Sequence, residues 1–316
     1  MGIWKKIADT IEDAQGDREE VQNLLDDGDM VEALVLVNEK LKEKPQSAGL
    51  LFAKGLVLEE FGYYHDALEC YDMVLSIRPD HEDATINKIS ILIDELHEFQ
   101  AGLDALELLP KALHNENAFQ SVKADALLGL KKFKECEVIC EEILKDDRRD
   151  AATLECYADS CHGREDFEKS LELTNKILEI IPMDIETQNN KADLLNHLGR
   201  SEEALKISES MISQNSMDAD AWANKGESLI DMSEYEKAVN SLQTAVEIDS
   251  TFAEAWFYLA KAYAHVNNED DALDSLVVST SLDSEILDWL EDSSFDNIKN
   301  HPRFQKLVSK QKDQVN

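Results

Sequence analysis

Cysteine and histidine residues gather between positions 136 and 162, where their chemistry could hold a metal ion. Zinc binds thiolates and imidazoles, so Cys136, Cys140, Cys156, Cys161 and His162 are the first candidates. Their spacings match no zinc finger or knuckle, and helical periodicity places Cys136 and Cys161 at core positions. Reduced thiols in a core act as small apolar groups, so we expect packing; a redox-sensitive thiol is the alternative.

The familiar catalytic motifs do not occur in the sequence. His97-Glu98 resembles the start of a zinc-protease helix, but Ala101 stands where the second histidine belongs. There is neither a glycine-rich phosphate loop nor a Gly-x-Ser-x-Gly elbow. His162 and His197 lie near carboxylates and can titrate close to neutral pH, although solvated histidines are the simpler interpretation. The sequence predicts no enzyme activity, no cofactor and no metal.

The elements that carry these side chains follow a helical repeat. Small residues recur every 34 positions, with one interval of 35, at Ala33, Ala67, Ala101, Cys136, Ser170, Ala204, Ala238 and Ala272. A second column lies twelve residues earlier, at Val21, Gly55, Ile89, Ala124, Ala158, Ala192, Gly226 and Ala260. Helices that cross closely need small side chains where their backbones meet, so each unit is a pair of packed helices.

Proline and glycine residues recur with the same period, at the expected ends of helices. Pro45, Pro79 and Pro182 stand twelve residues after the small column, where a proline ends one helix without breaking the next. Gly62 and Gly199 share the phase between paired helices and suit a tight turn.

The pattern resembles the tetratricopeptide repeat (TPR) family. Two stretches match best, Ala48 to Asp80 with Gly55, Leu58, Tyr64, Ala67, Tyr71 and Pro79 in phase, and Ala219 to Ser250 with Trp222, Gly226, Tyr235 and Ala238. The resemblance implies an all-α, right-handed α-solenoid of eight 34-residue helix-turn-helix repeats, whose first helices line a concave groove.

The expected organisation has three parts. A capping helix covers residues 1–13, the eight repeats occupy 14–286, and a capping segment follows over 287–316, beginning with a helix near Ile286. The repeats start near 14, 48, 82, 117, 151, 185, 219 and 253. The third unit departs from the pattern at Glu98 and Pro110, and the one extra residue is expected between units three and four.

Charge narrows the choice of partner. The net charge of −36 comes from 67 acidic and 31 basic residues, and such a field repels nucleic acids and anionic membranes. Acidity serves either a cationic partner or solubility and salt adaptation. Five irregularly spaced cysteines and the lack of a long apolar stretch favour the reducing cytoplasm.

The expected groove is acidic and carries a series of amides. Asn87, Asn190 and Asn224 share one phase, each followed by Lys, and such a column can grip an extended backbone; a common polar Asn-Lys step is the alternative. The candidate groove residues are Asn87, Asp125, Glu155, Asp159, Glu186, Asn190, Asp193, Asn224, Glu227, Asp231 and Tyr258. Residues 155–231 are expected to form the main binding stretch.

These observations predict an interaction scaffold or adaptor that binds a basic or polar protein segment. The alternatives are the regulatory arm of an enzyme complex and a self-associating array. A monomer is favoured, with the oligomeric state left open.

Overall fold

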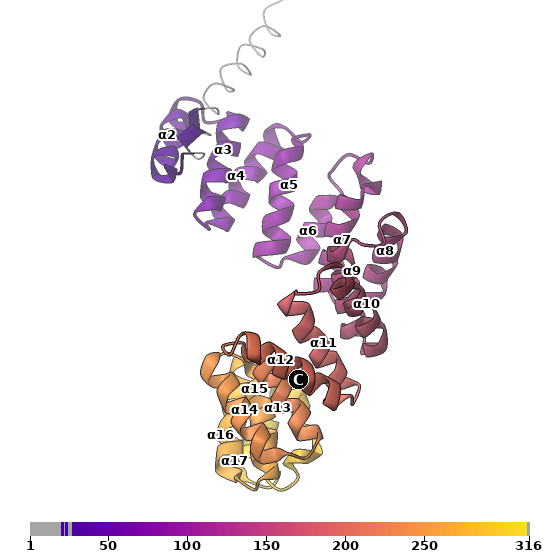
Figure 1. Cartoon of the computed structure of the whole chain (residues 1–316). Helices are drawn as coiled ribbons and strands as arrows, with labels where there is room; N and C mark the ends of the chain where they lie inside the picture. The colour runs from indigo at the N-terminus through magenta and orange to yellow at the C-terminus, as the bar shows by residue number, and fades with distance from the viewer. Residues whose placement is uncertain (1–19, 22, 25–26, 315–316) are drawn as a thin grey trace, which may run out of the picture. The chain divides into compact units, whose positions relative to one another are not determined.

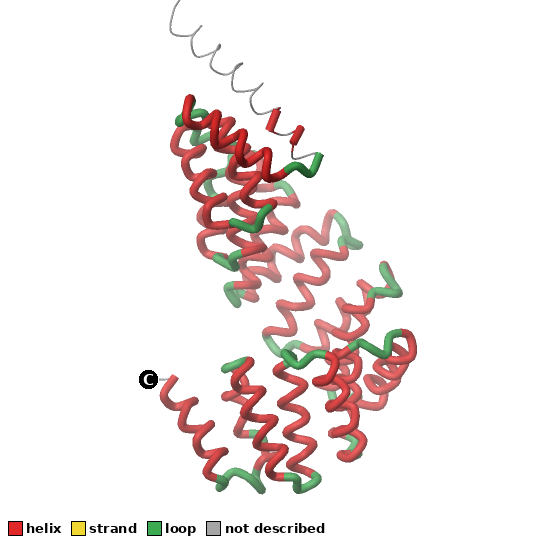
Figure 2. The backbone as a smooth tube through the Cα atoms, turned by 90° about the vertical axis from the view of Figure 1, so that its left-hand side faces the viewer, coloured by secondary structure: helices red, strands yellow, loops and turns green. Residues whose placement is uncertain are grey.

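The computed structural model describes residues 20–21, 23–24 and 27–314, and this part of the chain contains helices and turns but no strand (Figure 2). The predicted all-α fold is confirmed. The capping helix expected over residues 1–13 lies outside the described residues. Within the described part, no helix is both long and apolar enough to cross a membrane.

The chain divides into two compact units, Met1–Arg148 and Arg149–Asn316. The first unit contains α2 (Met30–Glu43), α3 (Ala48–Glu60), α4 (Tyr64–Ile77), α5 (Glu82–Ser90), η1 (Ile91–Glu95), α6 (Phe99–Leu106), η2 (Leu113–Asn115), α7 (Asn117–Gly129) and α8 (Phe133–Asp146). The second contains α9 (Ala151–Gly163), α10 (Phe167–Ile180), α11 (Ile185–His197), α12 (Ser201–Gln214), α13 (Ala219–Asp231), α14 (Tyr235–Ile248), α15 (Ala253–His265), α16 (Glu269–Leu282), η3 (Glu285–Glu291), η4 (Ser293–Phe295) and α17 (Pro302–Gln314).

Consecutive helices pack as hairpins, as Figure 1 shows. In the second unit α9 packs on α10, α13 on α14 and α15 on α16, and each hairpin also packs on the next one. We refer to α9, α11, α13 and α15 as the first helices of their hairpins. They carry most of the site described below.

A left-handed residue closes each hairpin turn. Gly62 and Gly199 have φ angles of 74° and 68°, as their predicted role requires. Six further residues in the same phase also have positive φ angles. One is Gly28, and the other five are not glycine: His97, Lys131, Glu165, Ser233 and Asn267. At Glu165, the amide of the following Asp166 donates to the Cys161 carbonyl at 2.9 Å, which satisfies the end of α9.

The second column of small residues lies where paired helices approach most closely. A Cβ atom built on Gly55 would lie 2.5 Å from the Tyr71 ring, and one on Gly226 would overlap the Leu242 side chain. Ala192 and Ala260 are fully buried in the same phase. The column is small because a neighbouring side chain already fills the space.

The third hairpin corrects the sequence interpretation. The extra residue lies inside its first helix, where α5 gives way to the π-helical turn η1, and not between units three and four. The turn residue His97 therefore follows Gly62 by 35 positions. Gly102, buried against Ile93, takes the close-packed place that the 34-residue spacing assigned to Ala101. Pro110 follows a shortened α6, because proline cannot continue a helix.

The C-terminal segment covers the last hairpin. Ile286, Leu287 and Leu290 belong to η3, so the helix expected to begin near Ile286 is a 3-10 helix, and an α-helix, α17, follows only at Pro302. These side chains join Phe295 and Phe304 in one core with residues of α15 and α16. An apolar face that would otherwise meet solvent is thereby buried.

Candidate functional site

The second unit contains a hollow with a volume of about 1070 Å³. Its walls come from α9, α11, α13 and α15, from the turns that precede three of these helices, and from η3. The lining residues are His162, Met183, Asp184, Ile185, Glu186, Asn189, Asn190, Asp193, His197, Asn215, Met217, Asp218, Ala219, Asp220, Ala223, Asn224, Glu227, Phe252, Glu254, Ala255, Tyr258 and Trp289.

The hollow is strongly acidic. Seven carboxylates line it, Asp184, Glu186, Asp193, Asp218, Asp220, Glu227 and Glu254, and none of its lining residues is Lys or Arg. Low-dielectric walls around charges of one sign focus the field and attract cations.

Apolar side chains lie beside the acids. Met183 and Met217, in the turns before α11 and α13, are 69% and 67% exposed. Ile185, Phe252 and Trp289 add to this apolar lining. The hollow therefore offers both charge and apolar contact to a ligand.

Glu227 is the most perturbed carboxylate of the hollow. Burial raises its pKa to about 8, and the charges of Asp193 and Asp231 act in the same direction. The hydrogen bond with Tyr258 and the charge of Lys261 oppose this rise only in part. Glu227 is consequently mostly protonated at neutral pH while no cation is bound.

Two other acids of the hollow also have raised pKa values. Burial raises the pKa of Glu254, with Asp193 as the next cause. Burial likewise raises the pKa of Asp220, assisted by Asp218. The nearby Lys261 is already held at 2.9 Å by Asp292.

A polar network fixes α11 against α13. Asn224 Nδ2 donates to the Asn189 carbonyl at 3.2 Å, and Asn196 Nδ2 donates to the Asn224 carbonyl at 3.1 Å. Asn189 Nδ2 donates to Asp218 at 3.2 Å, and Asp218 also caps α13 by accepting from the Ala221 amide at 3.0 Å. Within the described part of the chain, the buried Asn189 Oδ1 has no donor.

Two histidines meet one carboxylate at the wall of the hollow. His162 Nε2, from the last turn of α9, lies 3.4 Å from Asp193 Oδ2, and His197 Nε2 lies 3.6 Å from Asp193 Oδ1. The hydrogen bond to Asp193 raises the pKa of His162. The sequence interpretation set both histidines aside because it could not place α9 against α11.

The predicted groove residues fall in several places. Six of them line the hollow: Glu186, Asn190, Asp193, Asn224, Glu227 and Tyr258. Glu155 and Asp159 line a smaller cavity of about 140 Å³ whose walls come from α9, α10 and α11. Asp231 accepts a hydrogen bond from Ser201 at 2.9 Å.

Two predicted residues lie in the first unit. Asn87 Nδ2 donates to the Tyr71 hydroxyl at 3.1 Å, and Asp125 is exposed on α7. With Asn224 also bonded inside the fold, two of the three amides of the proposed series already hold helices together.

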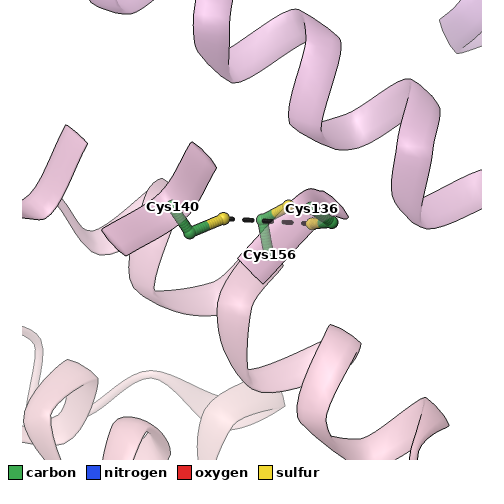
Figure 3. Close-up of side chains that lie close together, drawn as sticks. All are labelled: Cys136, Cys140 and Cys156. Carbon is green, nitrogen blue, oxygen red and sulfur yellow. Dashed lines mark hydrogen bonds between the residues drawn. The ribbon is translucent and has the colours of Figure 1, made fainter. Parts of the chain in front are cut away.

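All five cysteines are buried in the helical core, and none of them forms a disulfide. Cys136 and Cys140 lie one turn apart on α8, with their sulfur atoms at 3.9 Å (Figure 3). Cys156 is buried on α9.

Several lining residues were missed by sequence reasoning, which considered only the first helices. Met183, Met217 and Phe252 lie just before a first helix, and Trp289 comes from η3. Met183 and Met217 each directly follow a position in the proline phase, and this shared spacing was the available signal for these two residues.

Comparisons with known proteins agree with the hairpin geometry. A family profile described as "Tetratricopeptide repeat" matches residues 48–81, which include α3 and α4. A second, described as "TPR repeat", matches residues 226–266, which include α14 and α15. The chain is a tetratricopeptide repeat protein.

Solved tetratricopeptide structures share its fold. A tetratricopeptide repeat protein from Parabacteroides merdae superposes with a TM-score of 0.63 at 18% identity, covering 78% of this chain and 98% of that one. The Cut9–Hcn1 hetero-tetramer of the APC/C gives a TM-score of 0.52 at 18% identity, covering 95% of this chain and 62% of that one. No curated protein sequence matches the chain.

Proposed function

We propose that this tetratricopeptide repeat protein is a scaffold whose acidic hollow binds a Lys- or Arg-bearing, partly apolar segment of a partner protein. The fold supports a role in protein–protein interaction. The observation that carries the finer proposal is the lining of the hollow, with seven carboxylates, exposed methionines and no basic residue.

Electrostatics favours a cationic segment at this place. Burial raises the pKa of Glu227, and repulsion from the carboxylates of Asp193 and Asp231 adds to that rise. A Lys or Arg side chain placed among them relieves the repulsion and gains charge-assisted hydrogen bonds. An acidic segment would add to the repulsion.

The apolar side chains of the hollow favour a segment that also carries apolar residues. Met183, Met217 and Trp289 expose flexible or aromatic surface beside the acids. Methionine-rich surfaces adapt to varied apolar side chains. A segment that alternates basic and apolar residues would satisfy both parts of the lining.

We further propose that the protein acts without catalysis, in a reducing compartment such as the cytoplasm. Tetratricopeptide repeats generally serve as non-catalytic scaffolds, and six of the predicted groove residues line a hollow suited to binding. Five buried cysteines that form no disulfide suit reducing conditions.

The test measures binding of a short labelled Lys/Leu peptide to the full chain by fluorescence anisotropy. The variant D159K/D193K/E227K should weaken binding by about tenfold or more, because it places three lysines among the acids of the hollow and its neighbouring cavity. The affinity of the unaltered protein should fall as NaCl rises from about 50 to about 500 mM.

A matched control separates the site from the overall charge. The variant E168K/E202K/E236K likewise replaces three acidic residues with lysine, at exposed positions of α10, α12 and α14. Its affinity should stay close to that of the unaltered protein. Equal loss in both triple variants would assign binding to general charge and contradict the proposal.

A further inference from the structure

Two neighbouring first helices bring three metal-ligating side chains together in the second unit. His162 lies in the last turn of α9, while Asp193 and His197 lie one turn apart on α11. One imidazole nitrogen from each histidine and one carboxylate oxygen of Asp193 all lie within 4.8 Å of one another. The two helices meet here through the side chains of His162 and Asp193.

The spacing of these atoms suits a metal ion. Nitrogen and oxygen ligands held at about 2.1 Å in a tetrahedron lie about 3.4 Å apart. The two histidine–carboxylate separations are 3.4 and 3.6 Å. The side chains are 35–44% exposed, so the imidazoles can make the small rotation that brings all three donors to one ion.

Aromatic contacts orient the two imidazole rings. Phe167 stacks on His197 with ring centroids 4.5 Å apart and planes 3° apart. The same phenylalanine meets the edge of His162 at 5.4 Å. These contacts restrict both rings, and the Nε2 atoms of both face Asp193.

The acids around these side chains are balanced better by a bound divalent cation than by the single positive charge of a protonated histidine. Asp159 and Glu254 add negative potential at His162, and Asp193 adds it at Glu227 and Glu254. No Lys or Arg lines this hollow to balance these charges. A bound divalent ion would neutralise two of them at once.

We propose that His162, Asp193 and His197 form a binding site for one divalent transition-metal ion of the zinc class. Imidazole ligands select zinc, cobalt, nickel and copper over magnesium and calcium, which prefer oxygen donors alone. Three protein ligands leave at least one coordination position for water or for a donor from a bound segment. The three ligands also line the hollow proposed to bind a peptide, but metal binding itself requires no partner.

The experiment titrates the reduced full chain with Zn²⁺ by calorimetry and with Co²⁺ by visible absorption. One ion per chain should bind, and millimolar Mg²⁺ should not displace it. The variants H197Q and D193N should each lower the affinity by at least about tenfold. Circular dichroism and thermal melting establish that each variant is folded.

His265 provides the matched control. It is the last residue of α15, as His197 is of α11, and its ring stacks on Tyr235 at 4.1 Å. Lys261 stands four residues before it, where His197 has Asp193. H265Q should therefore lose the same kind of stacking while leaving metal affinity unchanged.

Three results would overturn the proposal. Unchanged Zn²⁺ affinity in folded H197Q and D193N would place any bound ion elsewhere. An intense sulfur-to-cobalt charge-transfer band would assign the ion to the cysteines. Lack of saturable binding would leave the three side chains as an ion pair alone. H197Q also removes a ligand without removing a carboxylate, so failure of metal binding stays distinguishable from failure of peptide binding.

Discussion

At the scale of single residues, Glu227 combines burial with repulsion from other acids. Its pKa of about 8 in the folded chain compares with an ordinary value of 4.5. The groups that act on it come from three first helices: Asp193 on α11, Asp231 on its own α13, and Tyr258 and Lys261 on α15. An acid in such a place opposes folding whenever it must be ionised.

The sign of this effect follows from proton binding. Between pH 4.5 and about 8 the folded chain holds a proton on Glu227 that the unfolded chain has released. Stability contributed at this residue is therefore complete below pH 4.5 and declines as the pH rises through 8. E227Q should leave stability nearly unchanged at pH 4.5 and raise it by about 1–3 kcal/mol at pH 9, less than full linkage because some solvent reaches the site.

Urea unfolding at several pH values checks this prediction. E202Q, on an exposed glutamate of α12, serves as the control and should show no such pH-dependent gain. If E227Q gave the same stability difference at pH 4.5 and pH 9, the raised pKa would be refuted.

At the scale of elements, the hairpin turns store backbone strain. Glu165 has a φ angle of 61°, a region that costs a side chain more than it costs glycine. E165G should stabilise the second unit by about 0.5–1 kcal/mol because glycine adopts this turn without strain. Chemical denaturation measures the change.

Gly199 tests the same turn in the opposite direction. It has a φ angle of 68°, and a Cβ atom added to it would meet no atom of the described chain within 4 Å. G199A should therefore be destabilising through backbone strain alone. A stabilising G199A or a destabilising E165G would contradict this account of the turns.

Close packing between paired helices makes a separate prediction. A methyl group at Gly226 would overlap Leu242, which is fully buried. G226A should cost about 1–3 kcal/mol of unfolding free energy, because overpacking forces neighbours out of place. Adding L242V, which removes a methylene at the overlap, should recover part of that loss in the same denaturation experiment. If the double variant were less stable than G226A, a cause other than overlap would be indicated.

These elements also explain what the sequence could predict. The 34-residue period depends on close helix crossings, so the small columns and turn glycines were visible as residue types. The π-helical turn at Ile91–Glu95 was not, because its one extra residue leaves hydrophobic spacing on both sides intact. Counting along the small column therefore chose Ala101 where Gly102 packs.

The candidate site was predictable only in part. Helix phase identified acids on the first helices, and six of the predicted residues line the hollow. The position of a residue within the repeat does not tell whether its polar group is already hydrogen-bonded to another helix. Asn87 and Asn224 are both bonded in this way. Position within the repeat also does not bring His162 to Asp193, since that contact depends on how two helices meet.

At the scale of the whole molecule, the charge of −36 acts on both binding and stability. Salt screens attraction to a cationic segment, and it equally screens repulsion among the chain's own carboxylates. The two effects have opposite signs. Peptide affinity should fall with salt while the folded chain becomes more resistant to heat.

Thermal melting at pH 7.5 in about 20 mM and about 500 mM NaCl measures the second effect. Screened self-repulsion worth about 1–2 kcal/mol would raise the midpoint by about 2–6 °C for units of this size. The chain contains two compact units, so each transition is followed separately by calorimetry. An uncharged osmolyte at equal osmolality controls for water activity, because it leaves charge repulsion unscreened. A midpoint that stays constant or falls with salt would mean that the acids are already balanced within the fold, and the acidic hollow would then lose its electrostatic basis for attracting a cationic partner.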